Sequence, residues 1–296
     1  MFVIFSLAFC TAKLSVTSSG GEHILSARQR LPMPQWLAMQ NPAESFLLQV
    51  GANDHTSLRP NGYDGRHDPG PACVARGWRA VLLEPIASTF DVLQQHYSSL
   101  PNSRVKLKQA AICSSCEMQW TDMFRLDLSN RTGNWGSKHA DGRCAVITNE
   151  SGWISEISSL SRKHLLDHAG LYNWMPRECK QCARVLEKTL SPNCMKRLVQ
   201  DNLVVEKVHC ACLSNIASTQ RTVTLLLIDA EGHDVDVLFK YPFGLVPTAR
   251  VAFEAIHLSN SAWRSAVKLL HDHGFESIDA HPGGQVLSTW HNVSWV

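Results

Sequence analysis

The sequence predicts an α/β protein built on a doubly wound, mainly parallel β-sheet. Three short apolar runs, at residues 46–50, 80–83 and 225–228, each stop at a small or acidic turn, as buried parallel strands do. Stretches with a helical spacing of apolar residues alternate with these runs. Such alternation is typical of a sheet covered by helices on both faces, in which ligands bind at the carboxyl ends of the strands.

The first part of the chain predicts an irregular lead-in followed by strand–helix units. Residues 21–45 contain three prolines and show no sustained hydrophobic period, so no regular element is expected there. The elements expected after them are a strand at 46–50, a short helix that includes 73–76, a strand at 80–83, a helix with apolar spacing from Ile86 to Tyr97, and a strand at 103–112.

The second part predicts an insertion and then a return to regular alternation. Residues from about 113 to 212 break the rhythm and form a cysteine-rich insertion. The elements expected after it are a strand at 223–229, a helix at 234–240, a strand at 250–256, a helix at 261–273 that Gly274 ends, and closing strands near Ser277 and at 286–289. One domain is therefore expected over residues 46–296, with the insertion inside it.

Composition and charge are those of an ordinary globular protein. Of the 296 residues, 44% are hydrophobic and 18% are charged, which is enough apolar material for a sizeable core. The net charge of +2 leaves no basic footprint for nucleic acid, so that class of partner is not expected.

The amino terminus predicts a secretory leader. Residues 1–20 begin with an apolar stretch that is too short to span a bilayer comfortably, although the basic residues that usually open a signal peptide are missing. A truncated or wrongly assigned start is the alternative. Asn130, Asn149 and Asn292 stand in N-x-[ST] sequons, which fit a secretory route. We therefore expect a secreted or secretory-pathway protein with no membrane span in the mature chain.

The ten cysteines fit two different chemistries. Nine remain once a leader that contains Cys10 is removed, and in an oxidising compartment these would form mostly local disulfides and leave an odd thiol. In a reducing compartment a structural zinc site could form instead. Its ligands would be Cys179, Cys182, Cys194 and one of Cys210 or Cys212. The leader favours disulfides.

Two strand ends predict a site for an adenosine ligand. The small residues of the Gly51–Asp54 turn would let the backbone approach a ligand closely. Glu84 ends the next strand, where an acidic residue accepts hydrogen bonds from ribose hydroxyls. His55 stands where a phosphate cradle would need another glycine, which argues against a dinucleotide. The alternative is a structural glycine turn beside a surface glutamate.

Five blocks of sequence, in the same order, resemble the FkbM family of S-adenosylmethionine-dependent methyltransferases. The blocks are residues 48–54, 77–85, 110–112, 227–234 and 253–258, and the resemblance covers about 46–277. It implies a class I fold with a seven-stranded, Rossmann-like methyltransferase sheet and S-adenosyl-L-methionine as cofactor. The cofactor-binding residues that it implies are Gly51, Ala52, Asn53, Asp54, Glu84, Ala110 and Ala111. Gly51 and Asn53 would line the methionine end, Glu84 the ribose, and Ala110 and Ala111 the adenine.

The same resemblance implies catalytic residues at two further strand ends. Asp229 and Glu231 would face the transferred methyl, and Glu254 and His257 would lie next to it. A hydroxyl acceptor must lose its proton, and His257 is the first candidate for the base because its pKa lies near working pH. His257 could instead close a strand through hydrogen bonds, and Asp229 could serve only as a carboxylate at a helix start. No third convergent carboxylate is recognisable, so no metal is predicted.

The resemblance therefore implies O-methylation of a small-molecule or glycan acceptor, such as a sugar or another hydroxylated metabolite. The alternative is a secreted binding module that retains the methyltransferase fold without turnover, which His55 and the crowded insertion motivate. A nicotinamide dehydrogenase is disfavoured because the glycine pattern after Gly51 is missing.

Overall fold

The computed structural model describes residues 2–7, 33–55, 68–126, 158–171, 200, 203–255 and 258–277. The chain divides into two compact units. One contains residues 1–119 and 209–296, and the other contains residues 120–208. The second unit falls within the segment that the sequence predicts to be inserted.

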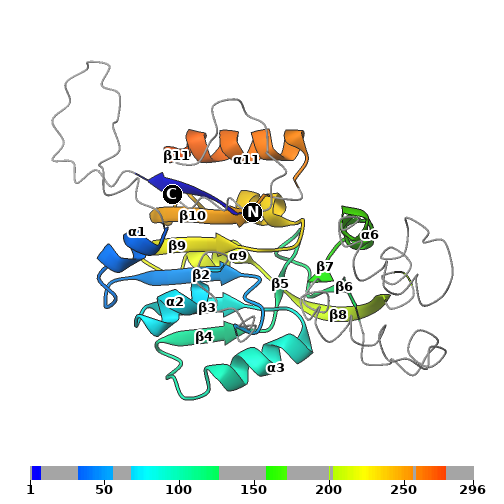
Figure 1. Ribbon diagram of the computed structural model, residues 1–296, viewed down its shortest axis with the longest axis horizontal. Coiled ribbons are helices and arrows are strands. Elements are labelled where there is room, and N and C mark those ends of the chain that lie inside the picture. Colours follow the sequence, from blue (N-terminus) through cyan, green and yellow to red (C-terminus); the bar gives the residue numbers. More distant parts are fainter. Residues whose placement is uncertain are drawn as a thin grey trace, which may run out of the picture. The chain divides into compact units, whose positions relative to one another are not determined.

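A mainly parallel sheet forms the centre of the first unit (Figure 1). In the described residues it has seven strands in the order β11-β1-β10-β9-β2-β3-β4. Their bounds are β1 Phe2–Leu7, β2 Phe46–Val50, β3 Arg79–Leu83, β4 Val105–Lys108, β9 Val223–Ile228, β10 Thr248–Glu254 and β11 Phe275–Ser277. The five strands from β10 to β4 are parallel, whereas β1 runs antiparallel to both of its neighbours. The predicted α/β class and mainly parallel sheet are confirmed.

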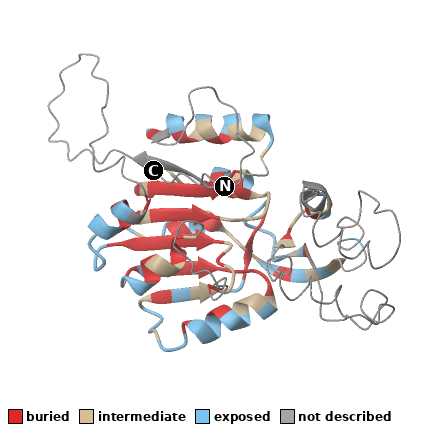
Figure 2. Cartoon of the chain, viewed as in Figure 1, coloured by how far each residue is buried: buried red, intermediate tan, exposed pale blue. Residues whose placement is uncertain are grey.

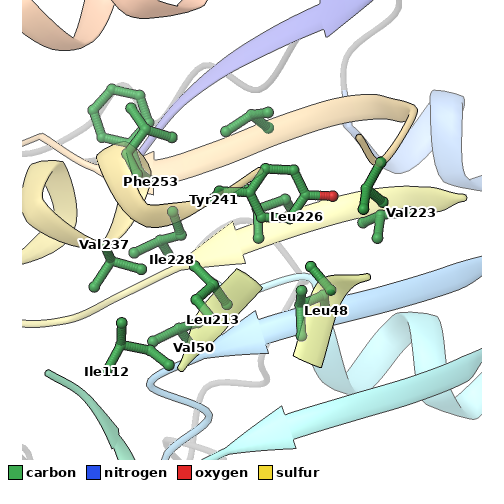
Figure 3. Packing of buried hydrophobic residues seen from close by; sticks show 14 of the residues in the cluster. Leu48, Val50, Ile112, Leu213, Val223, Leu226, Ile228, Val237, Tyr241 and Phe253 are labelled. Atoms are coloured by element: carbon green, nitrogen blue, oxygen red, sulfur yellow. The ribbon is translucent and has the colours of Figure 1, made fainter. Parts of the chain in front are cut away.

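Helices cover both faces of this sheet because successive side chains of a strand point to opposite faces. In β9, Leu225 and Leu227 pack in one hydrophobic cluster, and Leu226 and Ile228 pack in the other. The first cluster includes side chains of α1 (Met33–Met39), α2 (Gly70–Ala75) and α3 (Ala87–His96). The second includes side chains of α9 (Leu213–Ala217), α10 (Asp234–Lys240) and α11 (Asn260–Asp272). Figure 2 shows the buried central strands, and Figure 3 shows part of the second cluster.

The strand order creates a switch point between β2 and β9. From β2 the chain proceeds to β3 and β4 on one side, and it returns through β9 and β10 on the other. The backbone N–H of Asp229 donates to the carbonyl oxygen of Val50 at 2.8 Å, which holds the two strand ends together. Ligands of open α/β sheets bind at such a place.

The bounds of several elements match the expected ones, and others differ. Helix α10 coincides with the expected range, and Gly274, with φ of +81°, follows the end of α11. Helix α1 lies inside the expected irregular lead-in, where Met33, Trp36 and Leu37 form one buried helical face that is too short to create a sustained period. The expected strand 103–112 is split into β4 and β5 (Ala111–Ile112). The expected strand at 286–289 lies outside the described residues.

Strand β5 belongs to a different ladder from β4. Its two residues pair in parallel with Cys210 and Ala211, at the end of β8 (Leu203–Ala211). In the second unit, β6 (Trp120–Leu126) pairs antiparallel with β7 (Ser158–Ser159), which precedes α6 (Arg162–Leu171). The guanidinium of Arg125 donates to a carboxylate oxygen of Glu206 at 2.7 Å in that unit.

Two disulfides join the start of the insertion to its end. Cys113 bonds to Cys210 and Cys116 bonds to Cys212, across sequence separations of 97 and 96 residues. The expectation of local disulfides is therefore wrong for these four residues, because β5 brings distant segments together. The zinc alternative is also wrong as stated, since it needs one of Cys210 or Cys212. Its other ligands, Cys179, Cys182 and Cys194, lie outside the described residues.

These disulfides indicate an oxidising, extracellular-type environment. Among the described residues, the one free thiol belongs to the buried Cys73. Residues 2–7 of the expected leader form β1, and the leader stays a prediction. Across the described residues, every helix is too short or too polar to cross a membrane.

Candidate functional site

Polar turns follow four neighbouring strands of the main sheet. Gly51–Asp54 follows β2, Glu84 follows β3, Asp229–Gly232 follows β9, and Glu254 ends β10. Because β10, β9, β2 and β3 are adjacent and parallel, these turns lie along one edge of the sheet, at the switch point. The apolar runs that end in polar turns predicted the grouping of the first three, and the family resemblance implied that Glu254 lies next to them.

A close backbone contact requires a glycine at position 51. Its φ is +76°, and a Cβ atom at this position would lie 1.7 Å from the carbonyl oxygen of Asp229. The N–H groups of Gly51 and Ala52 both donate to the carbonyl of Leu83, at 3.0 and 2.9 Å. The sequence predicted that a ligand would approach the backbone at Gly51. In the structure the β9 turn occupies the space beside the Gly51 Cα.

Glu84 connects the turn after β2 to the turn after β3. Its carboxylate accepts hydrogen bonds from the backbone N–H of Asn53 at 3.0 Å and from that of Ile86 at 2.9 Å. The side chain is only 5% exposed, so Glu84 is not the surface glutamate of the alternative interpretation. The Asn53 side chain accepts from the Asp54 N–H at 2.7 Å, which tightens the same turn.

Three small residues of the expected cofactor site are buried. Ala52 is fully buried in the cluster that includes α1 to α3. Ala110 and Ala111 are also buried, and Ala111 pairs with Cys210 in the ladder of β5. Their methyl groups stabilise the fold, so mainly their backbone groups are available to a ligand.

Three carboxylates converge after β9 and β10. Oxygen atoms of Asp229, Glu231 and Glu254 all lie within 4.8 Å of one another, and the three residues are partly buried. Glu254 is the third convergent carboxylate that the sequence did not reveal, because the pairing of β10 with β9 brings it there. Carboxylates could hold a divalent cation, but such groups are also common without one, so the geometry alone assigns no metal.

Asp234 fixes the turn that carries Asp229 and Glu231. Its two carboxylate oxygens accept from the backbone N–H groups of Ala230 and Gly232, each at 3.1 Å. Glu231 adopts a left-handed backbone, with φ of +47°, inside this turn. The sequence placed Asp234 at a helix start without a role in the site, although an acidic residue just after a glycine turn is a recognisable capping signal.

Burial raises the pKa values of three carboxylates in this region, and the charge of Glu254 adds to the effect at Asp229 and Asp234. Burial raises the pKa of Asp229 well above its usual range, and the charges of Glu254 and Glu231 add to this effect. Burial also raises the pKa of Glu254. Burial and the charge of Glu254 raise the pKa of Asp234 to about 7. The group therefore retains a proton at a pH where isolated carboxylates are ionised.

The sequence analysis singled out two histidines, His257 and His55, and the structure describes only His55. His257, the first candidate for the base, lies outside the described residues. His55 was singled out as the residue that stands where a phosphate cradle would need a glycine. In the structure it has φ of +55°, is 8% exposed, and its ring contacts Tyr97 and Gln49.

Neither the family models, nor the curated proteins, nor the solved structures yield a match to this chain.

Proposed function

We propose that this protein is a class I methyltransferase of FkbM type that uses S-adenosyl-L-methionine to methylate a hydroxyl oxygen. The observation that carries the proposal is the gathering of the Gly51–Asp54 turn with four carboxylates at the switch point of a parallel sheet. Those carboxylates belong to Glu84, Asp229, Glu231 and Glu254.

The residues fit an adenosine ligand that carries a positive charge. The oxygens of Glu84 accept from the backbone N–H groups of Asn53 and Ile86, and a carboxylate is also the type of group that accepts hydrogen bonds from ribose hydroxyls. The negative charge of Asp229, Glu231 and Glu254 favours a cation at the neighbouring strand ends. When bound, the cofactor supplies a methyl group on a positively charged sulfur. The chain itself has to orient the acceptor in line with that methyl.

The carboxylate cluster supports a role in proton removal from the acceptor. A general base works best when its pKa lies near the working pH. Burial moves the pKa values of Asp229 and Glu254 upward, toward that range, and at Asp229 the charges of Glu254 and Glu231 add to the effect. We assign the base to one of these two carboxylates, with His257 as the remaining candidate.

The acceptor and the compartment are parts of the same proposal. A small hydroxylated molecule or a glycan is the proposed acceptor, and the disulfides support passage through the secretory pathway.

The experiment is calorimetric titration of the full chain with S-adenosylhomocysteine, the demethylated product. We expect binding by the native protein and at least a tenfold weaker affinity for Glu84→Gln, because the amide presents one acceptor oxygen instead of two. Glu44→Gln, which changes an exposed carboxylate of the same unit, is the matched control and should bind normally.

Three outcomes decide between the proposal and its competitors. Absence of binding by the native protein would refute the methyltransferase. Tight binding of NADH in its place would indicate a dehydrogenase. Binding of S-adenosylhomocysteine without transfer of labelled methyl to a panel of hydroxylated acceptors would favour the binding module.

A further inference from the structure

A chain of buried hydrogen bonds lies next to the Gly51–Asp54 turn in the first unit. It joins four side chains: Tyr97 after α3, His55 after the turn, Gln49 in β2 and Asp68 before α2. His55 Nδ1 lies 2.6 Å from the Tyr97 hydroxyl, and His55 Nε2 lies 3.2 Å from Gln49 Oε1. Gln49 Nε2 donates to Asp68 Oδ2 at 3.1 Å, and the N–H of Gly70 donates to Asp68 Oδ1 at 2.6 Å.

The donors and acceptors of this chain have one consistent direction. Gln49 uses its nitrogen toward Asp68, so its oxygen must accept from His55 Nε2–H. In a neutral imidazole Nδ1 is then an acceptor, and it accepts a hydrogen bond from the Tyr97 hydroxyl. Burial lowers the pKa of His55 to about 3, with the charge of His96 acting in the same direction and that of Asp54 against it, so the neutral form is the relevant one.

The surroundings are built to fit this polar chain. Gln49 is 1% exposed in the middle of a core strand, where an unpaired amide would be costly. A Cβ atom on Gly70 would lie 2.0 Å from Gln49 Oε1, so glycine leaves the space that the amide occupies. His55 adopts a left-handed backbone conformation that residues other than glycine rarely take. The hydrogen bonds of its ring with Tyr97 and Gln49 hold it there.

We propose that this polar chain positions the Gly51–Asp54 turn for its ligand, with His55 and Tyr97 as positioning residues. The turn is held at both ends by the same chain, because Gln49 precedes it by two residues and His55 follows it directly. An ordered turn binds with a smaller entropy cost than one that must be fixed on binding. The identity of the ligand rests on the proposed function, whereas the positioning of the turn does not.

The test compares two variants that each remove one buried tyrosine hydroxyl. Tyr97→Phe removes the hydroxyl 2.6 Å from His55. Tyr241→Phe removes a hydroxyl that is also 2.6 Å from its partner, Thr248, in the other hydrophobic cluster. Both variants keep their rings in the core, so both should lose thermal stability. Only Tyr97→Phe should affect the turn.

Two readouts are measured on the full chain. The first is amide hydrogen exchange of residues 51–54, whose N–H groups all donate hydrogen bonds within the described structure. The second is the affinity for S-adenosylhomocysteine. For Tyr97→Phe we expect exchange about 3- to 10-fold faster and binding weaker by a similar factor, as loss of one buried hydrogen bond implies. Tyr241→Phe should leave both unchanged.

Equal effects of the two variants would overturn the positioning role, because stability alone would then explain them. Unchanged exchange in Tyr97→Phe would overturn it as well. If the native protein does not bind S-adenosylhomocysteine, the proposed function fails, and the exchange measurement alone decides the positioning role. If Tyr97→Phe does not fold, His55→Asn takes its place, since asparagine tolerates a left-handed backbone and cannot reach both ring partners.

Discussion

Replacement of Gly51 by alanine tests the contact on which the candidate site depends. The φ of +76° strains any side chain at this position, at a cost of about 1–3 kcal/mol. The new Cβ would also lie 1.7 Å from the Asp229 carbonyl oxygen, where ordinary contacts begin at 3.4 Å. The two turns must therefore separate.

Separation of the turns breaks the hydrogen bond that joins them, which the N–H of Asp229 donates to the carbonyl oxygen of Val50 at 2.8 Å. This bond is worth about 1 kcal/mol net. With the backbone strain, Gly51→Ala should lower the free energy of unfolding by about 2–4 kcal/mol.

Two other glycines separate the strain from the clash. Gly77 has φ of +101°, but the atom nearest to an added Cβ would be 3.7 Å away, an ordinary contact. Gly77→Ala should therefore lower the free energy of unfolding by the backbone strain alone, about 1–3 kcal/mol. Gly244 has nothing within 4 Å of an added Cβ, and Gly244→Ala should be nearly neutral. Urea unfolding of the three variants, with the disulfides intact, measures the differences. If Gly51→Ala is no more destabilising than Gly77→Ala, the contact with Asp229 is not as described.

Two further predictions concern stability. Each disulfide closes nearly the same long loop, across 97 and 96 residues, so removal of either pair should cost roughly 2 kcal/mol and removal of both considerably more than twice that. Non-reducing urea unfolding of Cys113→Ser with Cys210→Ser, of Cys116→Ser with Cys212→Ser, and of the fourfold variant measures this, and simple additivity would contradict it. Burial raises the pKa of Asp68 from an ordinary 3.8 to about 6, which disfavours the ionised form in the folded state. Its contribution to stability is therefore complete below about pH 4 and is lost as the pH rises through about 6, by about 3 kcal/mol in all. Asp68→Asn should flatten this part of the pH profile of unfolding, and an unchanged profile would assign it to other groups.

The elements that the sequence predicted well are those with a local pattern. Helix α11 has one apolar and one polar face. At its start the Ser259 side chain accepts a hydrogen bond from the Ala262 N–H at 3.2 Å, and Gly274 follows its end. The strands β2, β3 and β9 are largely apolar runs because both of their faces are covered. Such patterns lie within a few residues of one another, so they are visible without the fold.

The features that the sequence did not reveal depend on distant partners. Helix α1 is held by packing of Trp36 against Trp78 and Arg250, with no long periodic pattern of its own. The burial of the His55 ring depends on its contact with Tyr97, which lies 42 residues further along the chain.

By itself the sequence determined the α/β class, the order of most strands and helices along the chain, and the polar residues that follow β2, β3 and β9. Only the tertiary structure decided that the carboxylates of Asp229, Glu231 and Glu254 converge within 4.8 Å, that Gly51 packs against the Asp229 carbonyl, and that the insertion is closed by long-range disulfides. The physical reason is the same in each case. Strand order and backbone angles bring together groups that lie far apart along the chain, and local patterns carry no record of those contacts.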